Sequence, residues 1–299
     1  MSVTTLHGIV AYPVTPFRPD DGKVDIPALE ALVDRLVTSG SHAVAPLGST
    51  GESAYLDDDE WHAVAHASVA AVAKRVPTVV GVSDLTTHSA VRRARFAEQV
   101  GADAVMVLPV SYWKLSPREI VQHYGRIAEA VGIPVMIYNN PGTSGIDMTP
   151  ELMVALWEQF ENITMVKESS GDIQRMHRLT ELTDGRLPFF NGSNPLALEA
   201  LRAGAAGWCT AAPCLVPRLP LDLYEAVRTG DDTTAQEIFD RLSPFLRFIL
   251  DGGLPTTIKA GLSLQGFDAG EPRRPLLPLD AEGTQRLKEL LVGLEALGE

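Results

Sequence analysis

Cysteine, aromatic residues and surplus basic charge are all scarce in this sequence of 299 residues, and each scarcity excludes a class of protein. The only two cysteines, Cys209 and Cys214, match no zinc-binding or redox spacing, so we expect reduced structural thiols. Aromatic residues make up 6% of the chain, and Lys and Arg total 25 against 38 Asp and Glu. The resulting net charge of -13 disfavours a nucleic acid or an anionic membrane as the main partner.

Long apolar runs are also missing. No stretch of about 18 consecutive apolar residues occurs, and the opening residues MSVTTLHGIV contain no basic segment followed by a long apolar one. We therefore expect neither a membrane span nor export, and we predict a cytoplasmic protein. What is present, 45% hydrophobic and 21% charged residues, is typical of a globular protein with one large barrel or two average domains.

Short apolar runs alternate with longer amphipathic stretches as far as residue 230, which predicts an α/β fold of repeated βα units. Eight strands with intervening helices favour a TIM (β/α)₈ barrel. A doubly wound open sheet is the competing architecture, but no glycine-rich dinucleotide loop follows the first strand. The candidate strands are residues 7–14, 42–47, 78–82, 104–109, 135–138, 164–167, 189–191 and 207–210. The candidate helices between them are residues 26–38, 59–74, 89–99, 117–130, 150–159, 172–182 and 195–203.

Beyond residue 230 this rhythm stops, and three helical patterns follow at residues 233–250, 255–264 and 281–297. We predict a barrel carrying the active site over residues 1–230 and a C-terminal helical appendage, packed on the barrel, over residues 231–299. No linker or repeat marks the appendage as an independent unit.

A lysine closes the sixth candidate strand, where a TIM barrel places its active site. Because side chains alternate along a strand, Met165 and Lys167 share a face, and we expect Lys167 to point inward among apolar neighbours. Desolvation disfavours the ammonium form, so this amine can attack a carbonyl group. The alternative is a surface lysine at a strand end that pairs with Glu168.

Two further segments lie at neighbouring strand ends. Tyr138 ends the fifth strand, and its phenol can relay a proton to and from an imine or a carbonyl oxygen, although an ordinary interface tyrosine is the alternative. After the second strand, Gly48 and Gly51 flank Ser49 and Thr50, so that backbone N–H and side-chain O–H groups can converge on an anion. Alone this is a weak signal. With the lysine and the tyrosine, it predicts a site for a 2-oxo acid.

We expect no metal centre. His62 and His66 lie one helical turn apart, but no third ligand accompanies them, and a solvated helix face is the favoured interpretation. The acidic run from Asp57 to Glu60 is better explained as the capped start of a helix than as a magnesium site.

In these residues the chain resembles the dihydrodipicolinate synthase and N-acetylneuraminate lyase family of Schiff-base-forming, class I pyruvate aldolases, over nearly its whole length. The order and the spacing of three segments agree with the family. Those segments are Gly48-Ser49-Thr50-Gly51-Glu52, Tyr138-Asn139 with Pro141 and Gly145, and Lys167-Glu168 with Gly171-Asp172.

The resemblance implies that Lys167 forms an imine with pyruvate and that Tyr138 shuttles protons. It implies that Ser49 links Tyr138 to a tyrosine of a neighbouring subunit, for which we choose Tyr112, and that Ser49 and Thr50, with Gly48, hold the pyruvate carboxylate. It further implies a homo-oligomer built as a dimer of dimers, and no cofactor besides the covalent Schiff base.

Two departures from the family concern the second substrate. Thr143 stands where the synthases have an arginine for the aldehyde's carboxylate, and Asn194 and Pro195 stand where sialic acid lyases have acidic residues. We therefore expect a neutral aldehyde. The residues expected to line this part of the pocket are Asn140, Thr143, Gly192, Ser193, Asn194 and Cys209.

Three functions remain open at this point. The first is a lyase or aldolase that joins or separates pyruvate, or a related 2-oxo acid, and an aldehyde. The second is a dehydratase that acts on a 2-oxo-3-deoxy sugar acid through the same imine. The third, a catalytically silent binding or regulatory protein, is disfavoured because Lys167 and Tyr138 are both present.

Overall fold

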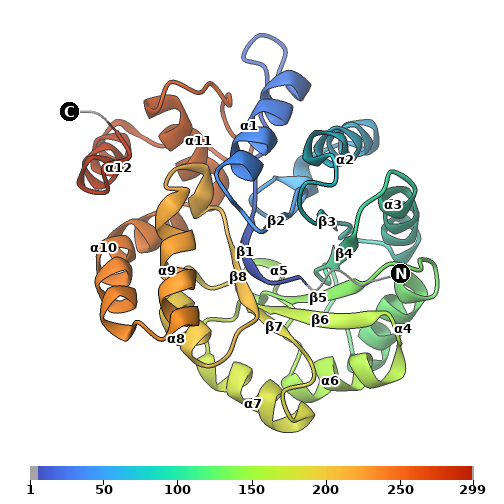
Figure 1. Ribbon diagram of the computed structural model, residues 1–299. Helices are drawn as coiled ribbons and strands as arrows, with labels where there is room; N and C mark the ends of the chain where they lie inside the picture. The colour runs from blue at the N-terminus through green and yellow to red at the C-terminus, as the bar shows by residue number, and fades with distance from the viewer. Residues whose placement is uncertain (1–5, 298–299) are drawn as a thin grey trace.

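A computed structural model describes residues 6–297, in which eight parallel strands form one sheet surrounded by helices (Figure 1). The strands are β1 (Gly8–Ala11), β2 (Ala43–Val44), β3 (Val79–Gly81), β4 (Ala104–Val107), β5 (Val135–Asn139), β6 (Ile163–Glu168), β7 (Phe189–Asn191) and β8 (Gly207–Thr210). Their order in the sheet is β2-β1-β8-β7-β6-β5-β4-β3, and a parallel bridge between Val44 and Thr78 joins the two end strands. The sheet is thus closed, and the predicted TIM barrel is confirmed.

All eight predicted strands are present, and several are shorter than predicted. The strand predicted over residues 7–14 stops at Ala11, just before Pro13, which has no N–H to donate to a neighbouring strand. The strand predicted over residues 42–47 covers only Ala43–Val44; Pro46 has no N–H to donate, and Leu47 adopts a left-handed backbone conformation with φ of 61°. Both shortened strands therefore release their last residues into loops at the barrel mouth.

Helices follow the strands, and polar caps set where many of them begin. At the start of α1, Ala28 N donates to the Asp25 side chain, and Pro27 occupies the first turn, where its missing N–H costs nothing. The barrel helices are α1 (Ile26–Thr38), α2 (Asp58–Val72), α3 (Thr87–Gln99), α4 (Pro117–Ala128), α5 (Pro141–Ser144), α6 (Pro150–Gln159), α7 (Ile173–Thr183), α8 (Ala197–Arg202) and α9 (Arg218–Thr229). Short 3₁₀ turns cover Ser53–Tyr55, Asn194–Leu196 and Ala212–Cys214.

Two of these helices were not predicted from the sequence. Helix α9 begins at Arg218, and the preceding Pro217 has no side-chain group that could cap its first turn, so the sequence gives no capping signal there. Helix α5 has only four residues, too few for a hydrophobic period to be visible.

Three helices follow the barrel, α10 (Asp232–Asp251), α11 (Leu254–Leu264) and α12 (Ala281–Gly293), and Figure 1 shows them together on one side of the ring. The last ends at Gly293 rather than at the predicted residue 297. Phe245 of α10, Ile258 of α11 and Leu287 of α12 belong to the same hydrophobic cluster as the barrel residues. No helix within residues 6–297 is long and apolar enough to cross a membrane.

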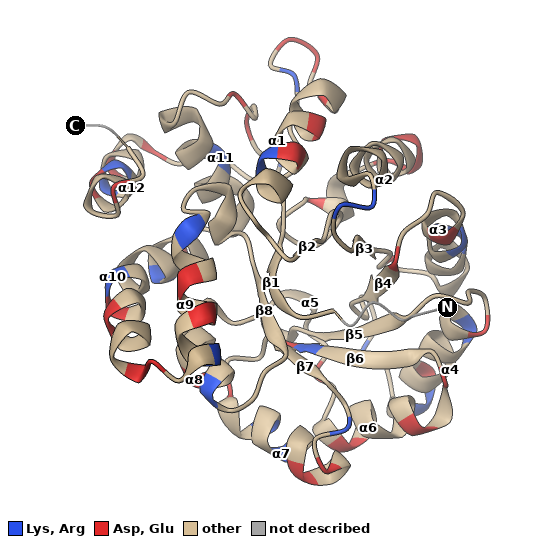
Figure 2. Ribbon diagram, viewed as in Figure 1, with Lys and Arg blue, Asp and Glu red and all other residues tan. Residues whose placement is uncertain are grey.

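Charged residues lie mainly on the helices and loops around the barrel, and the strands carry very few (Figure 2). Within the eight strands the only charged residues are Lys167 and Glu168, both in β6. Since adjacent residues of a strand point to opposite faces, one of these two side chains must enter the barrel.

Candidate active site

Lys167 enters the barrel from β6 and lies between two aromatic rings. Its side chain is almost completely buried, and its Nζ lies 4.0 Å from the ring centre of Tyr12 and 3.8 Å from that of Tyr138. No carboxylate within residues 6–297 lies within ion-pair distance of Lys167. No ion pair therefore has to be broken before Lys167 reacts with a carbonyl group.

Glu168 lies on the opposite face of β6, so the alternative in which it pairs with a surface lysine is wrong. Its carboxylate is fully buried and accepts hydrogen bonds from Asn139 Nδ2 at 3.0 Å and from Ser170 N at 2.6 Å. Arg175 provides the counter-charge, with Nε 3.5 Å from Glu168 Oε2. Glu168 therefore fixes the end of β6 and leaves Lys167 unpaired.

Tyr138 presents its ring to Lys167 and its hydroxyl to Asn140. Asn140 Nδ2 donates a hydrogen bond to Tyr138 Oη at 2.8 Å. Burial raises the pKa of Tyr138, but the Lys167 charge and hydrogen bonds from Asn140, Ser49 and Lys167 together outweigh it and lower the pKa below its usual value. This phenol can therefore release a proton more readily than an ordinary tyrosine.

The loop that contains Ser49 and Thr50 is bounded by two left-handed residues that are not glycines. Leu47 has a φ of 61° and Glu52 a φ of 55°, a conformation that costs energy for residues with a Cβ. The two glycines of the loop do not adopt this conformation. A Cβ on Gly48 would lie 2.9 Å from the Tyr12 ring, so this glycine is needed for close packing rather than for a left-handed turn.

The same loop contains donors without partners. Within the described residues, the backbone N–H groups of Ser49 and Thr50 have no hydrogen-bond partner. Thr50 is buried, and Thr15 Oγ1 holds the loop from behind by donating to Gly51 O at 2.6 Å. Free N–H groups with adjacent hydroxyls form a suitable cradle for a carboxylate.

Gly192 and Cys209, predicted to line the substrate pocket, both lie close to Lys167. A Cβ on Gly192 would lie 2.8 Å from Lys167 Cε and 1.8 Å from Ser169 Oγ, so only glycine leaves room for the lysine side chain. Burial raises the pKa of the Cys209 thiol against the opposing influence of Lys167 and a hydrogen bond with Tyr12. Cys209 therefore stays protonated beside Lys167.

The other predicted pocket residues differ in how they are held. Asn194 is buried, and its Oδ1 accepts hydrogen bonds from Thr210 Oγ1 at 2.9 Å and Trp208 Nε1 at 3.3 Å. Ser193 N donates to Asn191 Oδ1 at 3.0 Å. Thr143 is exposed in α5, where its backbone N–H donates to Asn140 Oδ1 at 3.2 Å. Asn140 thus connects α5 to Tyr138, whereas Thr143 faces solvent.

Tyr12 is the site residue that the sequence did not predict. It follows β1, and besides flanking Lys167 it donates a hydrogen bond from its hydroxyl to Met106 Sδ at 3.1 Å. Burial, with Cys209 adding to it, raises the pKa of Tyr12 well above its usual value, so it remains a neutral phenol. Its position at a strand end was the available signal, the same one that singled out Lys167 and Tyr138.

Tyr112 does not join the other predicted residues within one chain. It lies on the loop between β4 and α4 with 92% of its surface exposed, next to Trp113 at 79%. Their rings lie 6.1 Å apart in an edge-to-face arrangement.

The acidic run at residues 57–60 forms a helix cap. Asp57 accepts from Glu60 N at 2.8 Å, and Asp57 N donates to Glu60 Oε2 at 3.1 Å, which is the reciprocal capping box at the start of α2. Within residues 6–297, no group of three or more histidine, cysteine or acidic side chains could hold a metal ion.

Comparison with known proteins identifies relatives over nearly the whole chain. Residues 5–293 match the model of the dihydrodipicolinate synthetase family. A 4-hydroxy-tetrahydrodipicolinate synthase of Methanospirillum hungatei is 36% identical over 287 residues, which cover 95% of this chain and 98% of the relative. One from Bartonella bacilliformis is 38% identical over 274 residues, covering 92% and 93%.

Solved structures agree with these sequence matches. A candidate dihydrodipicolinate synthetase from Pseudomonas aeruginosa is 58% identical, with a TM-score of 0.96 over 97% of this chain and 100% of its own. YagE, a prophage protein of the dihydrodipicolinic acid synthase family from E. coli K12, is 28% identical, with a TM-score of 0.92 over 98% of this chain and 100% of its own. That protein was solved in complex with pyruvate.

Proposed function

The chain belongs to the dihydrodipicolinate synthetase family and is a Schiff-base-forming lyase for pyruvate and an aldehyde, and we propose that Lys167 is the residue that forms the imine. The observation that carries this assignment is the position of Lys167. Its Nζ is buried between the rings of Tyr12 and Tyr138, at 4.0 and 3.8 Å, and no carboxylate of residues 6–297 holds it as an ion pair. The proposed chemistry needs no further cofactor, because the lysine itself activates the carbonyl carbon.

In the proposed reaction, the Lys167 amine attacks C2 of pyruvate, and a C–N bond forms as the carbonyl oxygen takes a proton from Tyr138. Loss of that oxygen as water leaves a protonated imine, whose positive charge lies between the two aromatic faces. The Tyr138 phenolate then takes a proton from C3, which gives an enamine, and the enamine adds to the aldehyde carbon while the aldehyde oxygen takes a proton from water. Tyr138 suits both proton transfers because its pKa is lowered.

We assign the carboxylate of pyruvate to the loop at Ser49 and Thr50. The unpaired N–H groups of these two residues support this assignment, since they offer hydrogen bonds without any change in the fold. The loop is held by Thr15 and by its two left-handed ends, so the carboxylate would enter a preformed cradle.

The aldehyde is proposed to be neutral. Thr143, at the position where the family's synthases have an arginine, is exposed and uncharged, and the nearby Asn140 and Ser193 offer only hydrogen bonds. A second anionic substrate would meet no cation from these residues.

We also propose a homo-oligomer, a dimer of dimers, in which Tyr112 reaches the site of a neighbouring subunit. The 92% exposure of Tyr112 beside exposed Trp113 supports this, because large exposed aromatic side chains are typical of interfaces. The cytoplasm is the proposed location, since it keeps free thiols such as Cys209 and Cys214 reduced.

Reductive trapping tests the proposal. The protein is incubated with pyruvate and reduced with borohydride, and mass spectrometry of its peptides should locate the adduct on Lys167. We expect Lys167→Ala to abolish trapping while circular dichroism and thermal unfolding stay those of a folded barrel. Tyr138→Phe should slow trapping by roughly 10²-fold or more, because it removes the proton relay.

An adduct on another lysine, or none at all, would sink the assignment. A panel of neutral and anionic aldehydes and of 2-oxo-3-deoxy sugar acids then identifies the second substrate. Preferred turnover of an anionic aldehyde would contradict the neutral acceptor, and release of water from a sugar acid would establish a dehydratase instead.

A further inference from the structure

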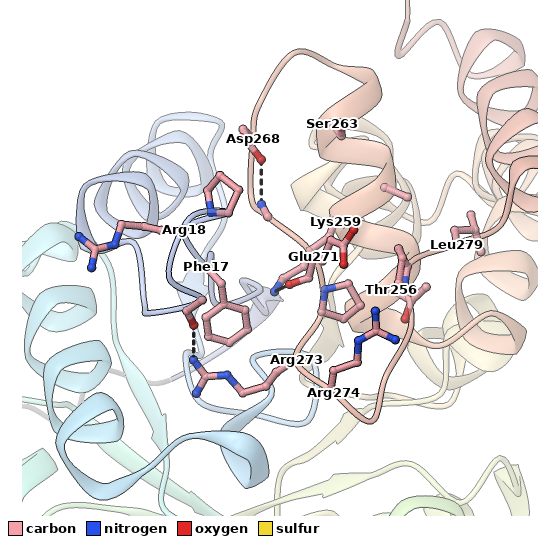
Figure 3. Close-up of a pocket in the computed structure, with 16 residues that line it drawn as sticks. Phe17, Arg18, Thr256, Lys259, Ser263, Asp268, Glu271, Arg273, Arg274 and Leu279 are labelled. Carbon is pink, nitrogen blue, oxygen red and sulfur yellow. Dashed lines mark hydrogen bonds between the residues drawn. The ribbon is translucent and has the colours of Figure 1, made fainter.

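A cavity of about 680 Å³ lies between the loop after β1 and the chain that leaves α11 (Figure 3). Neither Lys167 nor Tyr138 nor the Ser49–Thr50 pair lines it, so it is separate from the site described above. Its size falls within the range of small-molecule pockets. Side chains from residues 17–22 form one wall, and residues 256–279 form the rest.

Charged side chains of both signs line this cavity, and most of its cations are already engaged in ion pairs. Figure 3 shows Asp268 at the upper end and Arg274 at the lower end. The other three cations of the lining, Arg18, Lys259 and Arg273, are already paired, with Asp21, Glu52 and Glu60 in that order. Arg274 is exposed and has no ion pair or hydrogen bond within the described residues, so its guanidinium is the cation that remains free for a ligand.

The rest of the lining restricts the charge and the shape of the ligand. Phe17, Pro272 and Leu279 provide an apolar surface, which favours a ligand with an apolar body. Asp268 and Glu271 line the same space, and their negative charge disfavours an anion with more than one charge. One free guanidinium, an apolar wall and two acids together fit a small organic monocarboxylate better than a phosphate.

The cavity wall is connected directly to the loop that is proposed to bind the substrate carboxylate. Lys259 Nζ lies 2.7 Å from Glu52 Oε1, with both side chains buried, and Arg273 N donates to Glu52 Oε2 at 2.7 Å. Glu52 is the left-handed residue at the end of that loop. Lys259 Nζ also lies 3.9 Å from the Phe17 ring centre, and burial lowers the pKa of this lysine to about 8. Any ligand that moves this wall therefore acts on Glu52.

We propose that this cavity binds a small organic monocarboxylate through Arg274, and that its occupancy changes the affinity of the Ser49–Thr50 loop for the substrate carboxylate. The proposal that the cavity binds this ligand depends only on the cavity and its lining residues. The effect on the loop rests also on the proposed function.

Calorimetric titration of the unliganded wild-type protein with benzoate tests the binding site. We expect Arg274→Gln to weaken binding at least tenfold, because it removes the charged donor. Arg247→Gln is the matched control, since Arg247 is an exposed arginine outside the cavity, and it should bind benzoate as the wild type does. Absence of saturable binding, equal affinity in Arg274→Gln, or tighter binding of inorganic phosphate than of benzoate would each overturn the proposed site.

The effect on the loop is measured by borohydride trapping at increasing pyruvate concentration, with and without saturating benzoate. We expect the half-saturating pyruvate concentration to change at least twofold in the wild type and not in Arg274→Gln. An unchanged half-saturating pyruvate concentration in the wild type would overturn the coupling. An equal change in Arg274→Gln would also overturn it, because benzoate would then be competing with pyruvate at Lys167. If pyruvate leaves no adduct at all, the proposed function fails, while the calorimetric result still decides whether the cavity binds.

Discussion

At the scale of single residues, the proton affinity of Tyr138 depends on Asn140, which the sequence indicated only as a residue lining the pocket. Asn140 donates to Tyr138 Oη, which stabilises the phenolate. Replacing Asn140 by Ala removes this donor, so the pKa of Tyr138 should rise. The part of the pH–rate profile that is set by ionisation of Tyr138 should then move to higher pH. Initial rates of pyruvate trapping across the pH range measure this shift.

A second substitution at the same position separates the effect from a loss of local structure. Asn140 Oδ1 also caps α5, and Asn140→Asp keeps that acceptor while it replaces the donor by a negative charge. The pKa of Tyr138 should then rise further than in Asn140→Ala. Thr143→Ala changes an exposed residue about one helical turn away, so it should leave the Tyr138 limb of the pH–rate profile unchanged. A limb that moves to lower pH in either Asn140 variant would refute the role assigned to this donor.

The ring of Tyr12 is predicted to stabilise the positive charge of the imine. Tyr12→Phe keeps the aromatic face 4.0 Å from Lys167 Nζ, so it should trap pyruvate nearly as well as the wild type. Tyr12→Leu removes the face and should weaken imine formation by about 0.5–2 kcal/mol. The half-saturating pyruvate concentration in trapping assays measures the difference. Equal losses in the two variants would instead assign the effect to the hydroxyl and its bond to Met106.

These residues also show what sequence reasoning can reach. Lys167 and Tyr138 were predictable because each is a reactive side chain at the end of an apolar strand, where a barrel collects its site. Tyr12 occupies the same kind of position, but a tyrosine beside Pro13 gives no sign that it will face Lys167. That contact depends on how β1 and β6 lie across the barrel, which no local pattern contains.

At the scale of elements, the active-site loop depends on how tightly β3 packs against the end of β2. A Cβ on Gly81 would lie 2.1 Å from Leu47 O, the carbonyl that precedes the loop at Gly48. Gly81→Ala must therefore displace backbone, and we expect a loss of about 1–3 kcal/mol in the free energy of unfolding together with weaker pyruvate binding. Denaturant unfolding and trapping measure the two effects.

A glycine without neighbours is the control for this prediction. A Cβ on Gly293, at the end of α12, would meet nothing within 4 Å, so Gly293→Ala should leave both quantities within about 0.5 kcal/mol of the wild type. If Gly81→Ala lowers stability but leaves pyruvate binding intact, the loop does not depend on this contact.

The elements themselves were largely predictable, because hydrophobic period and polar caps coincide in most of them. The pattern located all eight strands and helices such as Ile26–Thr38 with its Asp25 cap. It missed α9, whose start has no capping side chain, and it overextended β2, which ends at Val44, before Pro46 and the left-handed Leu47. The left-handed backbone of Leu47 and Glu52 carries no sequence signal, because neither residue type prefers that conformation.

At the scale of the whole molecule, the C-terminal helices and the barrel share one hydrophobic cluster. The sequence predicted a barrel over residues 1–230 and an appendage over residues 231–299, and α9 ends at Thr229. The buried ion pair between Lys259 of α11 and Glu52 of the barrel crosses this predicted boundary. Because this buried pair joins residues 1–230 to residues 231–299, we expect the barrel and the appendage to unfold together rather than separately.

Breaking that pair from one side tests this cooperation. Lys259→Met leaves the fully buried Glu52 carboxylate without its counter-charge, and we expect a loss of about 3–5 kcal/mol in the free energy of unfolding. The double variant Glu52→Gln with Lys259→Met removes both charges and should recover most of that loss, because no isolated buried charge remains. Denaturant unfolding followed by far-ultraviolet circular dichroism and by tryptophan fluorescence should give one shared transition in each variant. Two separate transitions would mean that residues 1–230 fold without the appendage. If the double variant were as unstable as Lys259→Met, the lysine would act through its packing on Phe17 rather than through its charge.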